Sequence, residues 1–198
     1  MKKINQKQIN KEKLLNQGVG LLMQQGYHGT GLKEILDAVQ IPKGSFYTYF
    51  GSKENFAVET IEHYIKPYLV LLQSYLAQSE GNALGGLERY LQESIVELER
   101  TEFKGGCLLG NLIGELGETS DVCRMALQTS LNRYRDVWEL GLSRAQNEGT
   151  IRTDKSAREL ADLWILSWQG ALLLMKVEQS AAPLKQCYRE LLGSFFKA

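Results

Sequence analysis

The chain has 198 residues, with 43% hydrophobic and 23% charged side chains and a formal net charge of zero. This length and composition are those of an ordinary soluble protein of one or two domains, and they exclude an intrinsically disordered chain. Three cysteines without CxxC spacing and only two histidines argue against a disulfide framework, a zinc site or any other metal centre.

Long segments with apolar residues three and four apart predict amphipathic helices, and β-branched residues never alternate in runs, so we expect an all-α fold. Thr30 and Asp154 are expected N-caps, and Gly26 and Gly51 are expected helix ends. Pro42 suits the first turn of a helix, where its missing N–H costs nothing. In chain order, the expected helices cover residues 10–25, 32–39, 42–50, 52–76, 83–100, 108–116, 121–147, 155–177 and 183–196.

The first three expected helices, with a tight turn at Gln40 and Ile41, have the layout of a helix-turn-helix module, whose third helix lies in the DNA major groove. Residues 1–53 hold eight lysines against three acidic residues, about +5, so the remainder carries about −5. A basic head on an acidic body favours a polyanion such as double-stranded DNA as the partner of the head. A lysine-rich terminus without a partner would give the same charge.

The aromatic residues of the third helix are expected to divide between two faces. Phe46 and Phe50 are four residues apart and should face the core, although all four aromatics could also be plain core. On the other face, a lysine can read guanine or a phosphate, a threonine can contact a thymine methyl, tyrosine hydroxyls can reach phosphates, and small residues let the backbone approach base edges. The expected DNA-binding residues are Thr30, Lys43, Gly44, Ser45, Tyr47, Thr48, Tyr49 and Lys53.

The sequence has GY before Thr30, ILDAV before the turn, KGSFY and YF in the third helix, and SKE at the start of the fourth. With these features, residues 13–56 resemble the DNA-binding domain of TetR-family transcriptional regulators. The resemblance implies a DNA-binding domain, residues 1–52, joined by a long helix to a helical effector-sensing and dimerisation domain, residues 53–198. Two positions depart from the family: Gln40 stands where a turn glycine is usual, and Pro42 where a serine cap is common.

The last two long helices are the expected dimer interface. ELADLWILSWQGALLLMKV is the most apolar expected helix, and LKQCYRELLGSFF has an apolar stripe of its own. The resemblance implies that this pair forms half of a four-helix bundle between two subunits. The alternative is internal core of a monomer, but a two-fold regulator needs two recognition helices about one DNA turn apart, which favours the interface.

The segment KGGCLLGN places Cys107 at the start of a short helix. There the helix dipole and free amides stabilise a thiolate, so we expect a lowered thiol pKa, with Lys104 acting in the same direction. The alternative is a small, buried and inert cysteine. Cys123 and Cys187 lie inside expected helices without such features and are expected to be structural.

The body also resembles that of electrophile-responsive TetR-family repressors. In these a cysteine in this setting responds to electrophiles and reactive chlorine together with a lysine late in the body, and Lys176 matches its place. From the residues alone, a charge within LLLMKVE needs a partner such as Glu178 or a route to water. If the body instead binds an ordinary ligand, the expected pocket walls are Tyr90, Phe103, Tyr134, Trp138, Trp164 and Trp168.

The sequence predicts a DNA-binding regulator and not an enzyme, because neither histidine is placed near a paired carboxylate or serine, there is no glycine-rich phosphate loop, and no cofactor is indicated. The resemblance implies a homodimeric repressor that a small molecule, or modification of Cys107, releases from its operator. The alternatives are a regulator that responds to a non-redox ligand and a helical protein-binding adaptor. The polar first residues, and the lack of any apolar run near the roughly 20 residues that cross a bilayer, predict a cytoplasmic protein without a membrane partner.

Overall fold

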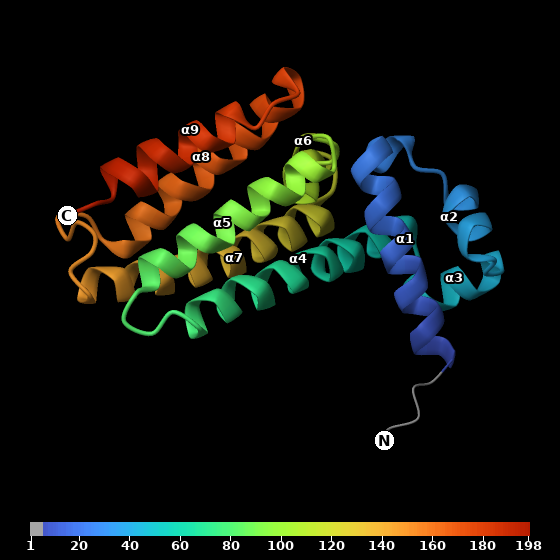
Figure 1. The fold of residues 1–198 in the computed structure, drawn as a ribbon. Coiled ribbons are helices and arrows are strands. Elements are labelled where there is room, and N and C mark those ends of the chain that lie inside the picture. The colour runs from blue at the N-terminus through green and yellow to red at the C-terminus, as the bar shows by residue number, and fades with distance from the viewer. Residues whose placement is uncertain (1–5) are drawn as a thin grey trace. The chain divides into compact units, whose positions relative to one another are not determined.

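The structure is a computed structural model that describes residues 6–198, and helices account for most of that range (Figure 1). The prediction of an all-α fold is confirmed. The helices are α1 (Gln6–Gly29), α2 (Leu32–Val39), α3 (Lys43–Phe50), α4 (Lys53–Ala77), α5 (Ala83–Arg100), α6 (Leu108–Leu116), α7 (Asp121–Asn147), α8 (Ala157–Glu178) and α9 (Ala182–Glu190), followed by a π-helical turn, Leu191–Phe195.

Two of the expected N-caps are wrong. The Thr30 hydroxyl donates to the Gly26 carbonyl (2.6 Å) in the preceding turn, and Gly31 occupies the N-cap of α2 without a side-chain bond. At α8, the cap is Ser156, whose hydroxyl accepts from the amide of Glu159 in a reciprocal capping box. The expected cap, Asp154, instead forms an ion pair with Arg152 (2.6 Å).

The turn between α2 and α3 contains a left-handed residue. Gln40 has φ 54° and ψ 41°, a conformation that costs an L-residue roughly 1–2 kcal/mol and that glycine adopts freely. This explains why a glycine is usual at this position. Pro42 is extended (φ −61°, ψ 143°) and is the N-cap of α3, so the prediction that it lies in the first turn is wrong by one residue.

The chain forms two compact units. Unit 1 comprises the chain up to Lys66 together with Cys107–Ser130, and unit 2 comprises Pro67–Gly106 and Leu131–Ala198. These units differ from the sequence division after residue 52, because α6 and the first ten residues of α7 pack with the N-terminal helices. The α4 and α7 helices each contribute residues to both units.

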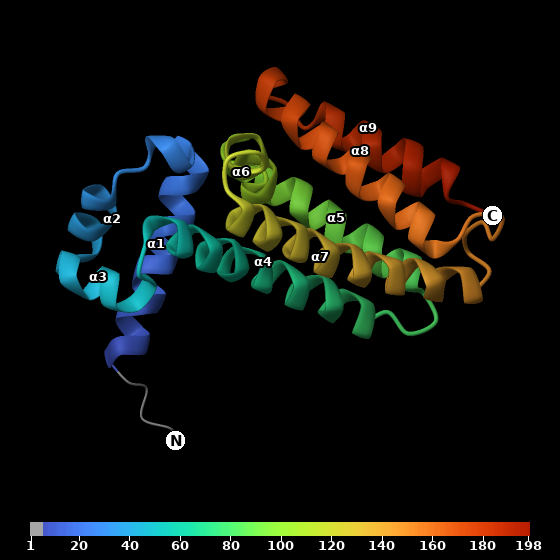
Figure 2. The same cartoon turned by 180° about the vertical axis from the view of Figure 1, so that it is seen from behind.

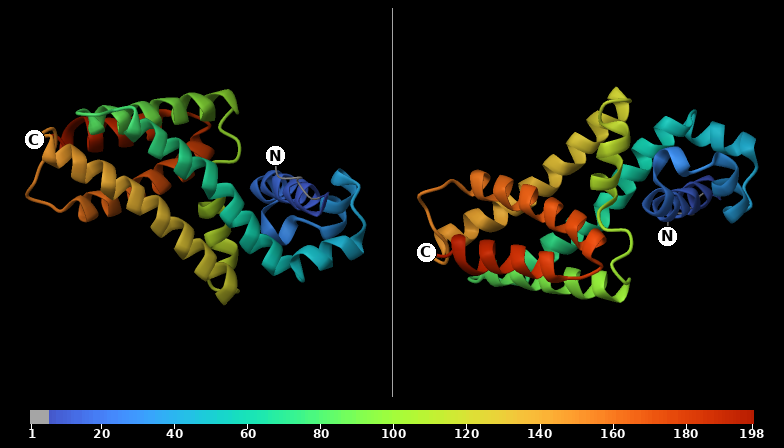
Figure 3. Two further views of the ribbon diagram at one scale, coloured as in Figure 1. Left: turned by 90° about the horizontal axis from the view of Figure 1, so that it is seen from below. Right: turned by 90° about the horizontal axis from the view of Figure 1, so that it is seen from above.

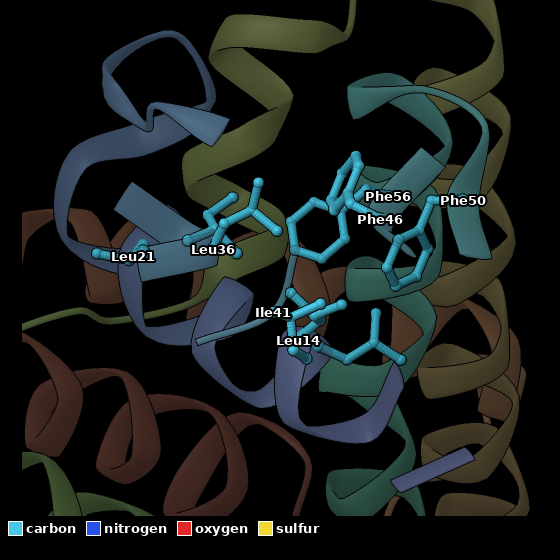
Figure 4. Packing of buried hydrophobic residues seen from close by; sticks show 9 residues of the cluster. Leu14, Leu21, Leu36, Ile41, Phe46, Phe50 and Phe56 are labelled. Atoms are coloured by element: carbon cyan, nitrogen blue, oxygen red, sulfur yellow. The ribbon is translucent and has the colours of Figure 1, made fainter. Parts of the chain in front are cut away.

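The core of unit 1 holds α3 between α1, α2 and the start of α4. Phe46 contacts the rings of Phe50 and Phe56, with centroids 5.1 and 5.2 Å apart. Figure 4 shows these three rings facing Leu14 of α1 and Ile41 of the turn. The prediction that Phe46 and Phe50 face the core is confirmed, since both are buried.

Unit 2 contains α8 beside α9, as two opposite views show (Figures 1 and 2). The α9 helix also packs against α5 (Figure 3). One face of α8 is buried, and its members are Leu160, Ala161, Trp164, Ile165, Trp168, Ala171, Leu172 and Met175.

Within residues 6–198, α8 is long and apolar enough to cross a membrane by length and composition alone. The uncharged stretch within α8 is shorter than the helix, because Asp162 and Lys176 bound it and leave only residues 163–175 without charge, fewer than the roughly 20 residues that cross a bilayer. A core helix of a soluble protein meets the same criterion, and one such helix is weak evidence for a membrane.

Candidate DNA-binding surface and sensor region

The surface of α3 that faces away from the core carries most of the predicted DNA contacts. Lys43, Gly44, Tyr47 and Thr48 are exposed, and Tyr47 keeps 47% of its surface accessible. The Thr48 hydroxyl donates to the Gly44 carbonyl one turn earlier (2.9 Å), which leaves its methyl group to face outward contacts. We call these four residues the α3 surface.

Ser45 and Tyr49 flank the α3 surface and are half-buried. The Tyr49 hydroxyl lies 3.5 Å from the side-chain nitrogen of Asn10, and the Lys7 ammonium lies 6.0 Å from the centre of its ring. Tyr49 therefore presents its hydroxyl at an edge where α1 supplies polar and cationic groups.

Thr30 and Lys53, two of the predicted DNA contacts, are bonded within the chain and lie outside the α3 surface. Thr30 is 1% exposed and its hydroxyl is bonded within the chain, so the structure does not present it to a phosphate. The Lys53 ammonium donates to the Tyr27 carbonyl (2.7 Å) and lies 4.4 Å from the centre of the Tyr27 ring. Partial burial in this position lowers the pKa of Lys53, and the nearby Glu115 carboxylate opposes that shift. Lys53 is thus anchored to α1 in this structure.

Cys107 occupies the N-cap position of α6, as the sequence predicts. It is half-buried, and the amide of Asn111 donates to its carbonyl (3.0 Å). The preceding Gly105 and Gly106 both have positive φ (88° and 73°), a conformation that favours glycine. Lys104, expected to act on the thiol, pairs with Glu102 (2.5 Å).

Lys176 lies in the last turn of α8 and is half-buried. Its aliphatic chain packs beside Gly106, where an added Cβ would lie 3.3 Å from the lysine Cδ. Gly106 is the residue before Cys107 in the chain. The stem of Lys176 thus lies against the segment that leads into Cys107.

Five of the six predicted pocket aromatics form one buried cluster in unit 2. The indole rings of Trp138 and Trp164 stack at 4.7 Å between centroids, and Trp168 stacks on Trp164 at 5.1 Å. The hydroxyls of Tyr90 and Tyr134 are 3.1 Å apart and share a hydrogen bond at one side of this stack. Burial raises the pKa of Tyr90 well above its ordinary value.

The sixth aromatic, Phe103, is half-buried and lies in the loop after α5, with φ 60°.

The tryptophan stack contains two buried indole N–H groups. Among the described residues, the Nε1 atoms of Trp138 and Trp164 are buried without a hydrogen-bond partner. A buried donor without an acceptor costs roughly 1–3 kcal/mol, so these two N–H groups are a local cost to the stability of unit 2.

Comparison with known families matches residues 14–60 to the bacterial regulatory proteins of the tetR family and residues 83–191 to the tetracyclin repressor-like C-terminal domain. The chain belongs to the TetR family. It is a DNA-binding transcriptional regulator, and its relatives are regulators and not enzymes. The resemblance predicted from the sequence is confirmed.

Several TetR-family relatives extend over nearly the whole chain. It is 32% identical to the transcriptional repressor DhaR of Mycobacterium sp. strain GP1, over 89% of this chain and 87% of that protein. It is 30% identical to the repressor NemR of Escherichia coli K12, over 88% of each. The crystal structure of E. coli NemR in its reduced form has a TM-score of 0.88 at 28% identity, covering 96% of this chain and 97% of that one.

A regulatory protein TetR from Rhodobacter sphaeroides is also similar, with a TM-score of 0.86 at 31% identity, covering 94% of this chain and 99% of that one. Sequence reasoning did not find the contacts that α1 makes with α3 and with α6 inside the chain. Lys7 and Lys11 are four residues apart on α1 and lie over the rings of Tyr49 and Phe50. The spacing of four residues could have indicated that Lys7 and Lys11 share one face of α1. No sequence pattern indicates the contact of Glu115 with α1, because it joins residues 88 apart.

Proposed function

We propose that this protein is a homodimeric repressor that binds operator DNA through the α3 surface and is released by an effector acting on its body. The observation that carries the DNA-binding part is the division of α3 into a buried aromatic face and an exposed face with Lys43, Gly44, Tyr47 and Thr48. Such a helix, held by a packed core, can enter a major groove with its small and polar residues against base edges. The cytoplasm, where the operator lies, is the compartment in which it acts.

Binding to the DNA upstream of its own gene tests this proposal. We expect specific binding whose affinity falls steeply as salt rises, because each neutralised phosphate releases counterions. The measurement is a titration of labelled operator and of a scrambled duplex at two salt concentrations. A helical protein-binding adaptor would show no preference for the operator, and that result would reject the repressor.

The second copy of the chain is proposed to dock on the outer face of α8. Leu166, Leu173 and Val177 are 73%, 55% and 81% exposed in the single chain. They are spaced seven and four residues apart around the exposed Gly170, so they form one apolar stripe opposite the buried face of α8. A stripe of this kind on a helix that already packs with α9 suits a four-helix bundle between two subunits.

Replacing Leu173 by glutamate is expected to convert the dimer into a monomer and to lower operator affinity by about tenfold or more, since two like charges would meet at a two-fold axis. Sedimentation equilibrium measures the association state. Leu140→Glu is the matched control, because Leu140 is 56% exposed on α7 and lies outside the stripe. Equal effects of both substitutions would contradict the assignment of the interface to α8.

For the effector, we propose modification of Cys107 by an electrophile or oxidant. Support comes from the half-buried position of this thiol at the N-cap of α6, from the Lys176 stem beside the preceding glycine, and from the relatedness to NemR, a protein solved in a reduced form. The family resemblance implies that such a modification moves α4 and changes the separation of the two recognition helices. This is a shift between two conformational populations.

The tryptophan stack supports a second candidate, a reversible ligand. The unpaired indole donors belong to the stacked rings of Trp138 and Trp164, and the Trp138 ring also contacts the rings of Tyr90 and Tyr134. A small, neutral, apolar molecule with a carbonyl or similar acceptor matches these groups by stacking and by hydrogen bonding. Lost operator binding that returns on simple dilution of the effector would favour this site. Binding lost to an oxidant and restored only by dithiothreitol, or lost to an alkylating agent and not restored by dilution, would favour Cys107.

A further inference from the structure

Within unit 1, a single side chain joins α6 to the end of α1. The Glu115 carboxylate, in the last turn of α6, accepts hydrogen bonds from the amides of Tyr27 (3.0 Å) and His28 (2.9 Å), one on each oxygen. Hydrogen bonds to an ionised carboxylate are about twice as strong as neutral ones. These contacts hold α6 on the segment that leads directly into α2.

The local structure of α1 is built for this contact. Gly26 has φ 72° and ψ −178°, which interrupts the helix and turns the amides of the next two residues toward α6. A Cβ at Gly26 would collide with the Glu115 carboxylate in its present position, so the glycine leaves space for it. The kink and the carboxylate therefore fit together, and a larger residue at position 26 would displace the Glu115 carboxylate and be strained at this positive φ.

The same short segment of α1 is also held by α4. The Lys53 ammonium, at the start of α4, donates to the Tyr27 carbonyl, while the Tyr27 amide donates to Glu115 of α6. The backbone of Tyr27 therefore bonds to both helices. The start of α7 is tied in as well, because the Ser120 hydroxyl bonds to the Glu54 carboxylate. Residues 26–28 are thus the point at which α1, α4 and α6 meet beside the helix-turn-helix.

We infer that Glu115 is a positioning residue for operator binding, whose carboxylate fixes the orientation of α2 and α3 through the Tyr27 and His28 amides. This rests on the proposed function. A displacement of α6, the helix that begins after Cys107, then reaches the α3 surface directly through unit 1 in addition to any movement of α4. The contact couples DNA binding to the state of α6 without contacting DNA itself.

The test compares Glu115→Ala and Glu115→Gln with Glu118→Gln, an exposed carboxylate just beyond α6. We expect Glu115→Ala to lower operator affinity by about tenfold or more while affinity for a scrambled duplex changes less than about twofold, because the α3 surface and its lysines are intact. Amide hydrogen exchange at Tyr27 and His28 should accelerate by at least about tenfold. Glu115→Gln should be intermediate, because an amide oxygen can still accept one bond, and Glu118→Gln should match the wild type.

Circular dichroism of each variant establishes that it is folded. If Glu115→Ala is unstable, Glu115→Gln carries the test, because glutamine has nearly the same shape as glutamate. Unchanged operator affinity together with unchanged exchange at residues 27 and 28 would overturn the inference. Equal losses of operator and scrambled-duplex binding would also overturn it, since they indicate general loss of the fold. A wild-type protein that prefers no operator would instead reject the proposed function, even where the exchange result confirms the contact.

Discussion

Phe46→Ala is expected to lower the free energy of unfolding of unit 1 by about 3–5 kcal/mol, as large-to-small changes of buried aromatics do. Phe46 is fully buried and contacts the rings of Phe50 and Phe56, so its removal leaves a cavity at the centre of the cluster. Operator binding should be lost with it, because the α3 surface depends on this core. Urea unfolding followed by far-ultraviolet circular dichroism measures the change.

Tyr47→Ala is the matched control, being the next residue and an aromatic side chain that is 47% exposed. We expect its unfolding free energy to stay within about 0.5 kcal/mol of the wild type, while operator affinity falls by about tenfold or more through loss of a phosphate contact. The two variants separate the faces of α3. A large loss of stability in Tyr47→Ala with normal binding in Phe46→Ala would reverse the assignment of the faces.

Cys107→Ser is expected to abolish release from the operator by iodoacetamide, the second large effect. The other two thiols are poor nucleophiles in this fold. Cys123 is fully buried, with a raised pKa that has burial as its main cause, and burial raises the pKa of Cys187 to about 11. At pH 8 only about one part in a thousand of Cys187 is then the reactive thiolate, and this fraction grows about tenfold per pH unit up to the pKa.

Release is followed by fluorescence anisotropy of labelled operator, and the labelled cysteine is identified by mass spectrometry. Cys187→Ser is the control and should respond as the wild type does at pH 8. Labelling of Cys187 should become appreciable only as the pH rises toward 11. Release that persists in Cys107→Ser would remove the thiol switch and leave the reversible ligand at the tryptophan stack.

The helix bounds could be predicted well wherever the sequence itself stops a helix. The limits of α5, α6 and α7 agree with the prediction because glycine, asparagine and aspartate mark their ends. The caps at Thr30 and Asp154 could not be chosen from residue type alone, since several candidates lie within a few residues of each helix start. At α8, the reciprocal bonds of Ser156 and Glu159 decide between them.

The site was predicted in part. The exposed positions on α3 follow from helical periodicity, because Phe46 and Phe50 fix which face is buried. The anchoring of Lys53 on Tyr27 and of Glu115 on the kink could not be predicted, because these contacts join residues 26 and 88 apart in sequence. Exposure of a charged residue depends on which distant helix covers it, and a single sequence does not contain that information.

The stack of Trp138, Trp164 and Trp168 gives the protein an optical property. These are all three tryptophans of the chain, and every one lies in unit 2. Intrinsic tryptophan emission therefore reports the environment of the body alone, and a transition confined to unit 1 would pass without changing it. Unfolding curves from tryptophan emission and from helix content would coincide only if the two units lose their structure in one cooperative step.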